Sequence, residues 1–342
     1  MKKRRFSSPF LLPVSVVVPM RNSETTIGLT LGSTVSQKYP IREIFVFDNN
    51  STDQSVELVK KFQKKCSIPI SLIRRKDNKG LSASYNEGVA LARSDLVVFV
   101  HSDSTLPTTK EIKKLVQPLY DREDVVATYP TAILPRDVWE RFTFWEKCHF
   151  SRVAGVETTG FNGKFDCIRR SIFLKLGGFD TTNFIGKGVG GEDADFYLRL
   201  QTVGHVVLSS ARVTHLHYLG KEFSLYDWIR IRKLLARTYG RLLRLHGNRL
   251  PLSTTKWGLS VPLGWLVFMI KPILAILPLL PWTNILGISL LLIYTLVKSW
   301  RIYTTISTLR DLRVLTLPFI DIYLIYYETF WMLESFLFLQ KK

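Results

Sequence analysis

Acidic and amide side chains recur in the N-terminal part of the chain, each time directly after a run of apolar residues. Asn22 and Glu24 follow the first run, Asp48 the second, Asp77 the third and Asp103 the fourth. If each run is a strand of one parallel sheet, these side chains meet where open α/β sheets bind their ligands. Carboxylates and amides at such an edge suit a ligand rich in hydroxyl groups and a cation held by oxygen atoms.

Asp103 lies in the segment VVFVHSDSTLP, Val97 to Pro107, where an apolar run breaks into polar residues and a proline. The run predicts a buried strand that ends just before the carboxylate. On this segment alone, the simpler interpretation is that Asp103 caps a helix beginning near Thr108, because Asp and Ser are common cap and turn residues. The motifs in the rest of the chain must decide between a cap and a ligand-binding residue.

The elements that position these residues alternate between strand and helix patterns. Strands are predicted at 15–19, 43–48, 70–74 and 96–100, and helices after Ser23, which is expected to cap the first, and at 54–65 and 82–93. This alternation, with short polar turns, predicts a parallel sheet covered by helices on both faces, a Rossmann-like half. No GxGxxG follows the first strand, which argues against the usual dinucleotide-binding site.

The chain of 342 residues carries a formal net charge of +19 and three cysteines far apart in sequence. The charge indicates nucleic acid, anionic lipid or a phosphorylated substrate as a partner. No zinc-finger spacing, RNP-type motif or heptad repeat is present, so we expect no nucleic-acid partner. Positive charge beside an apolar tail is typical of the cytoplasmic side of a membrane. The cysteine spacing supports neither a disulfide framework nor a zinc site.

Several segments follow one another in a recognisable order: VSVVVPMRNSETT, EIFVFDNNSTDQS, NKGLSASYNEGVALA, VVFVHSDSTLP, and GGFD followed by GGEDADFYLRLQTVG. Each segment alone is a weak signal. Together, over roughly residues 13–217, they resemble the family 2 glycosyltransferases with the GT-A fold. The resemblance implies an α/β, Rossmann-like, mostly parallel sheet with a site for a nucleotide-sugar donor.

The resemblance also assigns roles to individual positions. Residues that match donor-binding positions of the family are Pro19, Asn22, Glu24, Asp48, Arg75, Lys79, Gly80 and His101. Pro19, Asn22 and Glu24 are expected to line the nucleotide pocket, and Asp48 to bind the base or ribose. Arg75, Lys79 and Gly80 are expected to flank the base and phosphates. Asp103 takes the last position of the family's Asp-x-Asp motif, whose carboxylate coordinates the divalent Mn2+ or Mg2+ that bridges the diphosphate.

His101 stands where the family commonly has the first Asp of that motif. A neutral imidazole is a poorer ligand for Mg2+ than a carboxylate but is acceptable to Mn2+. Two other interpretations stay open: His101 hydrogen-bonds the sugar or ribose, or it is a buried histidine at a strand end with no catalytic role. This difference from the family motif affects the prediction of the metal's identity more than the prediction of the fold.

Glu192 and Asp193 follow the glycine-rich segment from Ile185 and begin a predicted helix. The positive end of a helix stabilises carboxylates as anions, which suits a general base. In the family's Glu-Asp motif the second acid is the base of an inverting transfer, so the resemblance makes Asp193 the base and Glu192 the residue that orients it or the acceptor. Without the resemblance, the two acids would only complement the helix dipole.

Two histidines follow the last predicted strands, 205–208 and 213–217. His215 and His217 alternate along an extended segment, so they share one face. In the GT-A class a histidine near this point can complete the metal shell, which makes His215 the candidate metal ligand and His217 the second choice. A structural role for this pair is the competing interpretation.

Two aromatic or basic segments suggest contact with a membrane. Asp137 to Ser151 has helical spacing that gives it one aromatic face, expected to pack on the domain or to face lipid or a lipid acceptor. Leu225 to Leu245 predicts a basic amphipathic helix whose arginines lie among lipid phosphates. The Gln-x-x-Arg-Trp motif of the family's processive synthases is absent near this region.

The C-terminal part is apolar enough to predict membrane helices at 261–280 and 285–303 and a third, spanning or interfacial, at 315–339. Lys271 lies within the first of these and is expected to contact an acceptor phosphate or an acid of the third segment. Asp321 and Glu328, two turns apart, share a helix face. The predicted organisation is a GT-A domain at 1–220, a basic interfacial region at 221–257 and an α-helical membrane region at 258–342.

The leading hypothesis is a metal-dependent inverting glycosyltransferase, anchored in the cell membrane by several spans with its catalytic domain in the cytoplasm. It is expected to move one sugar from a nucleotide-sugar donor to a lipid-linked or other membrane-proximal acceptor. A processive polysaccharide synthase and a non-catalytic scaffold that binds sugar nucleotides are the alternatives. The sequence does not indicate the sugar, the base, the acceptor or the oligomeric state.

Overall fold

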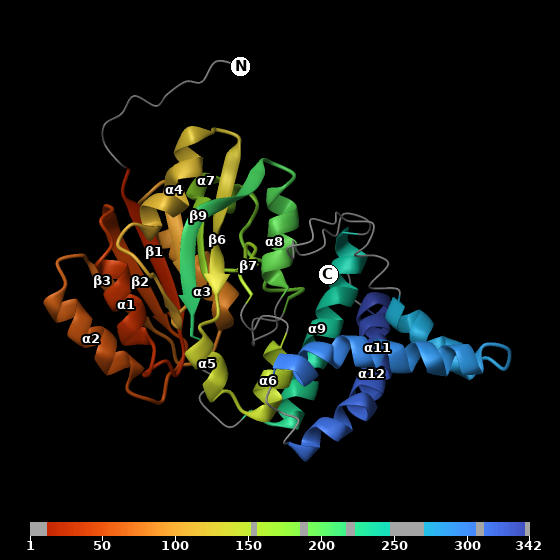
Figure 1. Cartoon of the computed structure of the whole chain (residues 1–342). Coiled ribbons are helices and arrows are strands. Elements are labelled where there is room, and N and C mark those ends of the chain that lie inside the picture. The colour runs from red at the N-terminus through yellow and green to blue at the C-terminus, as the bar shows by residue number, and fades with distance from the viewer. Residues whose placement is uncertain are drawn as a thin grey trace. The chain divides into compact units, whose positions relative to one another are not determined.

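The computed structural model describes residues 12–151, 156–184, 191–216, 223–246, 270–305 and 311–338 (Figure 1). The chain divides into two compact units. The sheet unit comprises Met1–Val138 and Gly155–Gly220, and the helical unit comprises Trp139–Ala154 and Lys221–Lys342.

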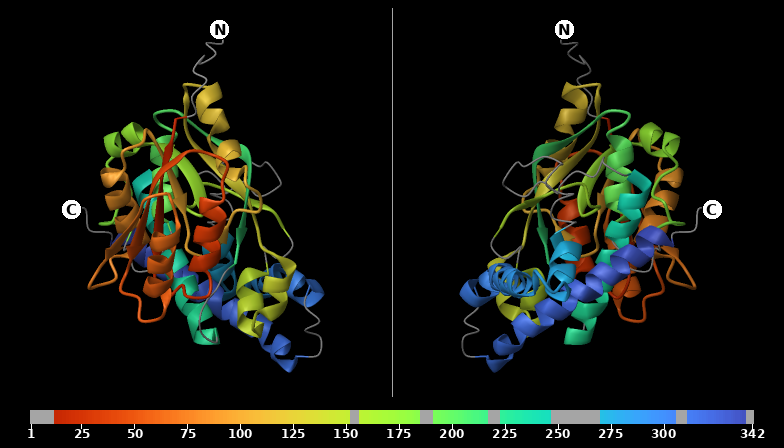
Figure 2. Two further views of the ribbon diagram at one scale, coloured as in Figure 1. Left: turned by 90° about the vertical axis from the view of Figure 1, so that its left-hand side faces the viewer. Right: turned by 90° about the vertical axis from the view of Figure 1, so that its right-hand side faces the viewer.

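The sheet unit is built on one mixed sheet with the strand order β3-β2-β1-β4-β8-β6-β9-β5, and β7 pairs with β6 (Figures 1 and 2). The strands are β1 Val14–Met20, β2 Ile41–Asp48, β3 Ile70–Arg74, β4 Leu96–Val100, β5 Ser104–Thr105, β6 Val125–Ile133, β7 Thr158–Thr159, β8 Phe165–Arg169 and β9 His205–His215. The first four strands in that order are parallel, as predicted. Beyond β4 the sheet is mixed, because β8 runs antiparallel to both β4 and β6, whereas β9 runs parallel to β6.

Helices cover both faces of this sheet, as the alternating pattern predicts. They are α1 Ile27–Val35, α2 Ser55–Lys65, α3 Gly80–Leu91, α4 Glu111–Asp121, α7 Arg170–Lys175 and α8 Glu192–Leu200. Apolar residues of α1, α2 and α4 pack with Val16 and Val98 on one face, and those of α3, α7 and α8 pack with Val17 and Phe99 on the other. Alternation along β1 and β4 therefore supplies both halves of the core.

Some predicted boundaries are wrong for local reasons. The first helix begins at Ile27 with Thr26 at the N-cap, and Ser23 instead forms the preceding turn, where its carbonyl accepts from the N–H of Ile27. Residues 205–215, which contain the segment predicted at 205–208 and the first part of that predicted at 213–217, form the single strand β9, which pairs with β6 over almost its whole length. The aromatic segment 137–151 forms two helices, α5 Arg136–Arg141 and α6 Phe144–Phe150, because Thr143 and Glu146 form a capping box that begins a new helix.

The helical unit contains α9 Leu225–His246, α11 Asn284–Thr305 and α12 Leu317–Leu337, with short 3-10 turns at Leu277–Leu279 and Leu312–Thr316. Basic side chains of α9 contact α12. Arg237 pairs with Glu334 at 3.1 Å, and the Lys233 ammonium lies 3.4 Å from the centre of the Trp331 ring. Some of the basic side chains expected to contact lipid phosphates therefore interact with α12 instead.

Buried acids of α12 hold the remaining helices together. Glu328 accepts from both Arg232 and Lys271, and Asp321 accepts from Lys298 and Ser299. The pairing of Lys271 with an acid of the third segment, one of the two predicted possibilities, is therefore confirmed. Asp321 and Glu328 are both buried, as their shared helix face requires.

Within the described ranges, no helix is long and apolar enough to cross a membrane. Residues 261–269 of the predicted span 261–280 lie outside those ranges, while 285–303 falls in α11 and most of 315–339 in α12. The structure therefore does not support the prediction of two or three spanning helices. One reason is visible in α12, where three acids interrupt the apolar sequence.

Candidate active site

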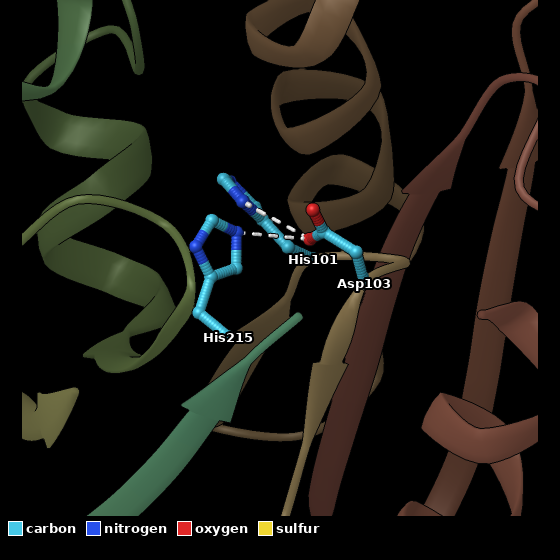
Figure 3. Close-up of side chains that lie close together, drawn as sticks. All are labelled: His101, Asp103 and His215. Carbon is cyan, nitrogen blue, oxygen red and sulfur yellow. Dashed lines mark ion pairs between the residues drawn. The ribbon is translucent and has the colours of Figure 1, made fainter. Parts of the chain in front are cut away.

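His101, Asp103 and His215 come together at one end of the sheet (Figure 3). Nε2 of His215 lies 3.0 Å from Oδ1 of Asp103, and Nδ1 of His101 lies 4.0 Å from the same oxygen. His101 and Asp103 follow β4, and His215 ends β9. The pairing of Ser104 with His215, and a hydrogen bond from the N–H of Leu216 to the carbonyl of Asp103, join the two segments.

This cluster has the composition of a divalent-metal site. One ligand atom from each residue lies within 4.8 Å of the others. Burial lowers the pKa of His101 to about 3, so its ring is neutral and retains a lone pair at neutral pH. Two imidazoles and one carboxylate are acceptable to Mn2+ and less suited to Mg2+. The residues therefore fit a divalent cation, and His101 belongs to the ligand cluster, whereas His217 lies outside the described residues.

Glu192 and Asp193 begin α8, as predicted. Oδ1 of Asp193 accepts from the N–H of Ala194 at 2.8 Å and from that of Gly191 at 3.2 Å. Burial nevertheless raises the pKa of Asp193, and burial followed by repulsion from Asp193 raises the pKa of Glu192 to about 7. The N–H groups at the start of α8 therefore favour the anionic form of Asp193, as expected, while desolvation opposes the ionisation of both acids. Residues 185–190 of the glycine-rich segment lie outside the described part.

Asn22 and Glu24 connect the loops that follow β1 and β2. Oδ1 of Asn22 accepts from the N–H of Thr52, and Oε2 of Glu24 accepts from that of Gln54, both at 2.9 Å. Pro19 lies in β1 beside Phe47 of β2. These three predicted donor residues therefore lie together at the ends of adjacent strands, where two of the side chains also brace the loops.

Asp48 ends β2 in a buried position. Its Oδ1 accepts from the N–H of Ser51 at 2.9 Å. Its Oδ2 accepts no hydrogen bond from any described residue, and Nε of Arg74 lies 3.7 Å from it. A buried carboxylate oxygen without a hydrogen bond is costly, so its place at the ligand-binding edge suits a hydroxyl or N–H donor from a ligand.

Arg75, Lys79 and Gly80 occupy the segment between β3 and α3. The Arg75 guanidinium donates to Asn49 and Ser84 at 2.9 Å and pairs with Glu87 at 2.6 Å. It is therefore engaged within the sheet unit. Lys79 is the N-cap residue of α3, and the N–H of Gly80 donates to Oδ1 of Asn78.

Sequence reasoning missed three residues near the metal cluster: Tyr85, Lys164 and Asp166. The Asp166 carboxylate accepts from the N–H groups of Asn162 and Gly163, and burial raises its pKa to about 7. Burial lowers the pKa of Lys164, while the charges of Asp193, Asp166 and Asp103 oppose that change. Residues 161–164 gave no recognisable motif, and the tertiary structure alone brings this segment to the site.

Comparison with known proteins agrees with this architecture. Residues 15–177 match the family model described as Glycosyl transferase family 2. "Probable glycosyltransferase YdaM" of Bacillus subtilis is 29% identical over 220 residues, which cover 59% of the chain and 50% of that protein. A "Poly(ribitol-phosphate) beta-glucosyltransferase" of Bacillus spizizenii is 32% identical over 94 residues, or 27% of the chain and 15% of that protein. The chain thus spans half or less of the length of these relatives.

The fold is shared with a solved structure, "Mannosyltransferase PcManGT from Pyrobaculum calidifontis in complex with GDP-Man and Mn2+". The TM-score is 0.55 at 16% identity, and the match covers 97% of the chain and 89% of that protein. This likeness shows the fold, which is of the GT-A type. The similarity to family 2 glycosyltransferases thus covers residues 15–177, and the likeness in fold extends over 97% of the chain.

Proposed function

We propose that the chain transfers a single sugar, with inversion, from a nucleotide-sugar donor to an acceptor hydroxyl. The observation that carries the proposal is the cluster of His101, Asp103 and His215 in the same unit as the acid pair Glu192 and Asp193. The family match supports it, as does the shared fold of the mannosyltransferase solved in complex with GDP-Man and Mn2+.

In the proposed reaction, Asp193 accepts the proton of the acceptor hydroxyl as the acceptor oxygen bonds to the anomeric carbon. The bond from that carbon to the diphosphate breaks at the same time, and its electron pair leaves with the nucleotide. His101, Asp103 and His215 would hold a divalent cation, which when bound neutralises charge on the leaving diphosphate. Burial raises the pKa of Asp193, which makes its carboxylate a stronger base than an exposed aspartate.

A panel of nucleotide sugars tests this function directly. Each would be screened for thermal stabilisation of the protein with Mn2+, with Mg2+ and with EDTA, since a bound ligand stabilises by mass action. One donor should raise the melting temperature in Mn2+, and Asp103→Asn should abolish that shift. Product length on a gel then separates transfer of one sugar from processive synthesis. If no donor stabilises the protein or is turned over in Mn2+, the proposal fails.

We also propose that the acceptor is lipid-linked and that the helical unit associates with the cytoplasmic face of a membrane. Its interior holds polar side chains, Thr295, Ser299, Asp321 and Glu328, beside a small apolar cluster that includes Leu291 and Ile325. Large apolar side chains are exposed on α11 and α12, among them Ile285, Leu286, Ile293, Leu296, Val297, Phe319, Phe330 and Leu337. Large apolar side chains exposed in such number are typical of contact with lipid or protein.

Vesicle flotation can test the association with a matched pair of variants. Leu286 in α11 and Leu29 in α1 of the sheet unit are both 57% exposed. Leu286→Glu should weaken binding to phosphatidylcholine vesicles, because it places a charge in the apolar surface, whereas Leu29→Glu should bind like the wild type. Equal binding of both variants, or no binding by the wild type, would overturn the membrane proposal without touching the transferase proposal.

A further inference from the structure

The turn at 161–164, between β7 and β8, lies directly against the metal-ligand candidate His101. The N–H of His101 donates to the carbonyl of Lys164 at 3.1 Å. This bond continues the antiparallel pairing of β4 with β8, in which Val100 faces Phe165. The position of the His101 backbone is therefore fixed by the turn as well as by β4.

Gly163 determines how closely the turn approaches the His101 ring. Its φ of +76° lies in the left-handed region that favours glycine. A Cβ at this position would lie 3.1 Å from Cε2 of Tyr85 and 3.3 Å from Nε2 of His101. The Nε2 side of the ring thus abuts Gly163, while Nδ1 is the atom paired with Asp103 at 4.0 Å.

Two buried side chains hold the turn in place. The Asp166 carboxylate accepts from the N–H groups of Asn162, at 2.8 Å, and Gly163. Tyr85 donates its hydroxyl to the carbonyl of Gly163 at 2.7 Å, and its ring packs on Phe99 with centroids 4.3 Å apart. Both side chains are almost fully buried, so the loss of either would leave backbone groups of the turn without partners.

We propose that the turn 161–164 orients His101 as a metal ligand. Asp166 and Tyr85 hold the turn in place through hydrogen bonds, and Gly163 determines the position of the His101 ring. The inference rests on the proposed metal site and deepens it. Groups that orient metal-bound histidines commonly change metal affinity 10- to 100-fold when they are altered. A side chain at residue 163 should therefore weaken Mn2+ binding even without donor or acceptor.

The test compares two glycines with the same backbone conformation. Gly177 also has a φ of +76°, but a Cβ there would meet nothing within 4 Å. Gly163→Ala and Gly177→Ala thus both place an alanine at a φ of +76°, and only the first pushes on His101. Mn2+ binding to the full-length protein, followed by the EPR signal of free Mn2+, should weaken at least 10-fold in Gly163→Ala and stay within about 2-fold of wild type in Gly177→Ala.

A second variant keeps the inference testable if Gly163→Ala does not fold. Tyr85→Phe keeps the ring and removes only the hydrogen bond to Gly163, and it should weaken Mn2+ binding several-fold. Wild-type affinity in folded Gly163→Ala or Tyr85→Phe would overturn the positioning role while leaving the metal site intact. A wild-type protein that binds no Mn2+ would overturn the metal site and this inference together.

Discussion

Nε2 of His215 lies 3.0 Å from Oδ1 of Asp103, although the two residues are far apart in sequence. The register of a two-residue strand produces this contact, because Ser104 of β5 pairs with His215 of β9. A shift of one residue in that register would turn His215 to the opposite face of the sheet. The metal cluster thus depends on the β5–β9 pairing as much as on its three ligands.

Replacing His101 by Asp should change the preference for metal. Asp would restore the usual two-carboxylate motif, and carboxylates suit Mg2+ better than imidazole does. We expect the ratio of transfer rates in Mg2+ and Mn2+ to rise several-fold in His101→Asp. Initial rates across a titration of each metal would measure it, and an unchanged ratio would show that His101 does not act as a ligand.

Replacing Glu192 by Gln should stabilise the protein, increasingly so at higher pH. Burial raises the pKa of Glu192 from 4.5 to about 7, so its ionisation opposes folding as the pH rises between those values. Gln avoids this cost. The melting temperature of Glu192→Gln relative to wild type should therefore increase from pH 5 to pH 8. A difference that is constant with pH would contradict the raised pKa.

Glu328→Gln should destabilise the helical unit strongly. Glu328 accepts from both Arg232 and Lys271, and its replacement leaves two largely buried cations without an acid. We expect a loss of roughly 3 kcal/mol in the free energy of unfolding. All 8 tryptophans belong to the helical unit, so tryptophan fluorescence during urea unfolding reports on it alone.

Glu334→Gln on the same helix is the matched control for that measurement. Its partner Arg237 is partly exposed, as Glu334 is, so solvent screens the pair. The loss should be about 1 kcal/mol or less. Equal losses in the two variants would show that burial does not distinguish the two ion pairs.

The first four strands could be predicted from sequence because their apolar runs are short, β-branched and bounded by polar turns. Val14 to Met20 is buried throughout, as expected for a strand covered on both faces. The reversed direction of β8 could not be predicted in the same way. Strand direction is set by the pairing of β8 with β4 and β6, and such pairing has no local signature in the sequence.

Among the site residues too, those with a local sequence signal could be predicted and those without one could not. His101, Asp103, His215 and the acids at the start of α8 could be identified because each follows a strand or begins a helix within a motif. Tyr85 and Asp166 could not, because Tyr85 lies in α3 and reads as an ordinary core aromatic, and Asp166 lies inside a strand. Their contacts with the turn at 161–164 exist only in the folded sheet unit.

The most direct test of the account is transfer by Asp193→Asn, using the donor that stabilises the wild type in Mn2+. Asn keeps the size of the side chain but cannot take the acceptor proton. We predict that the variant binds this donor within about 3-fold of wild-type affinity while nucleotide release in the presence of acceptor falls at least 100-fold. Transfer by Asp193→Asn at the wild-type rate would contradict the assignment of the catalytic base.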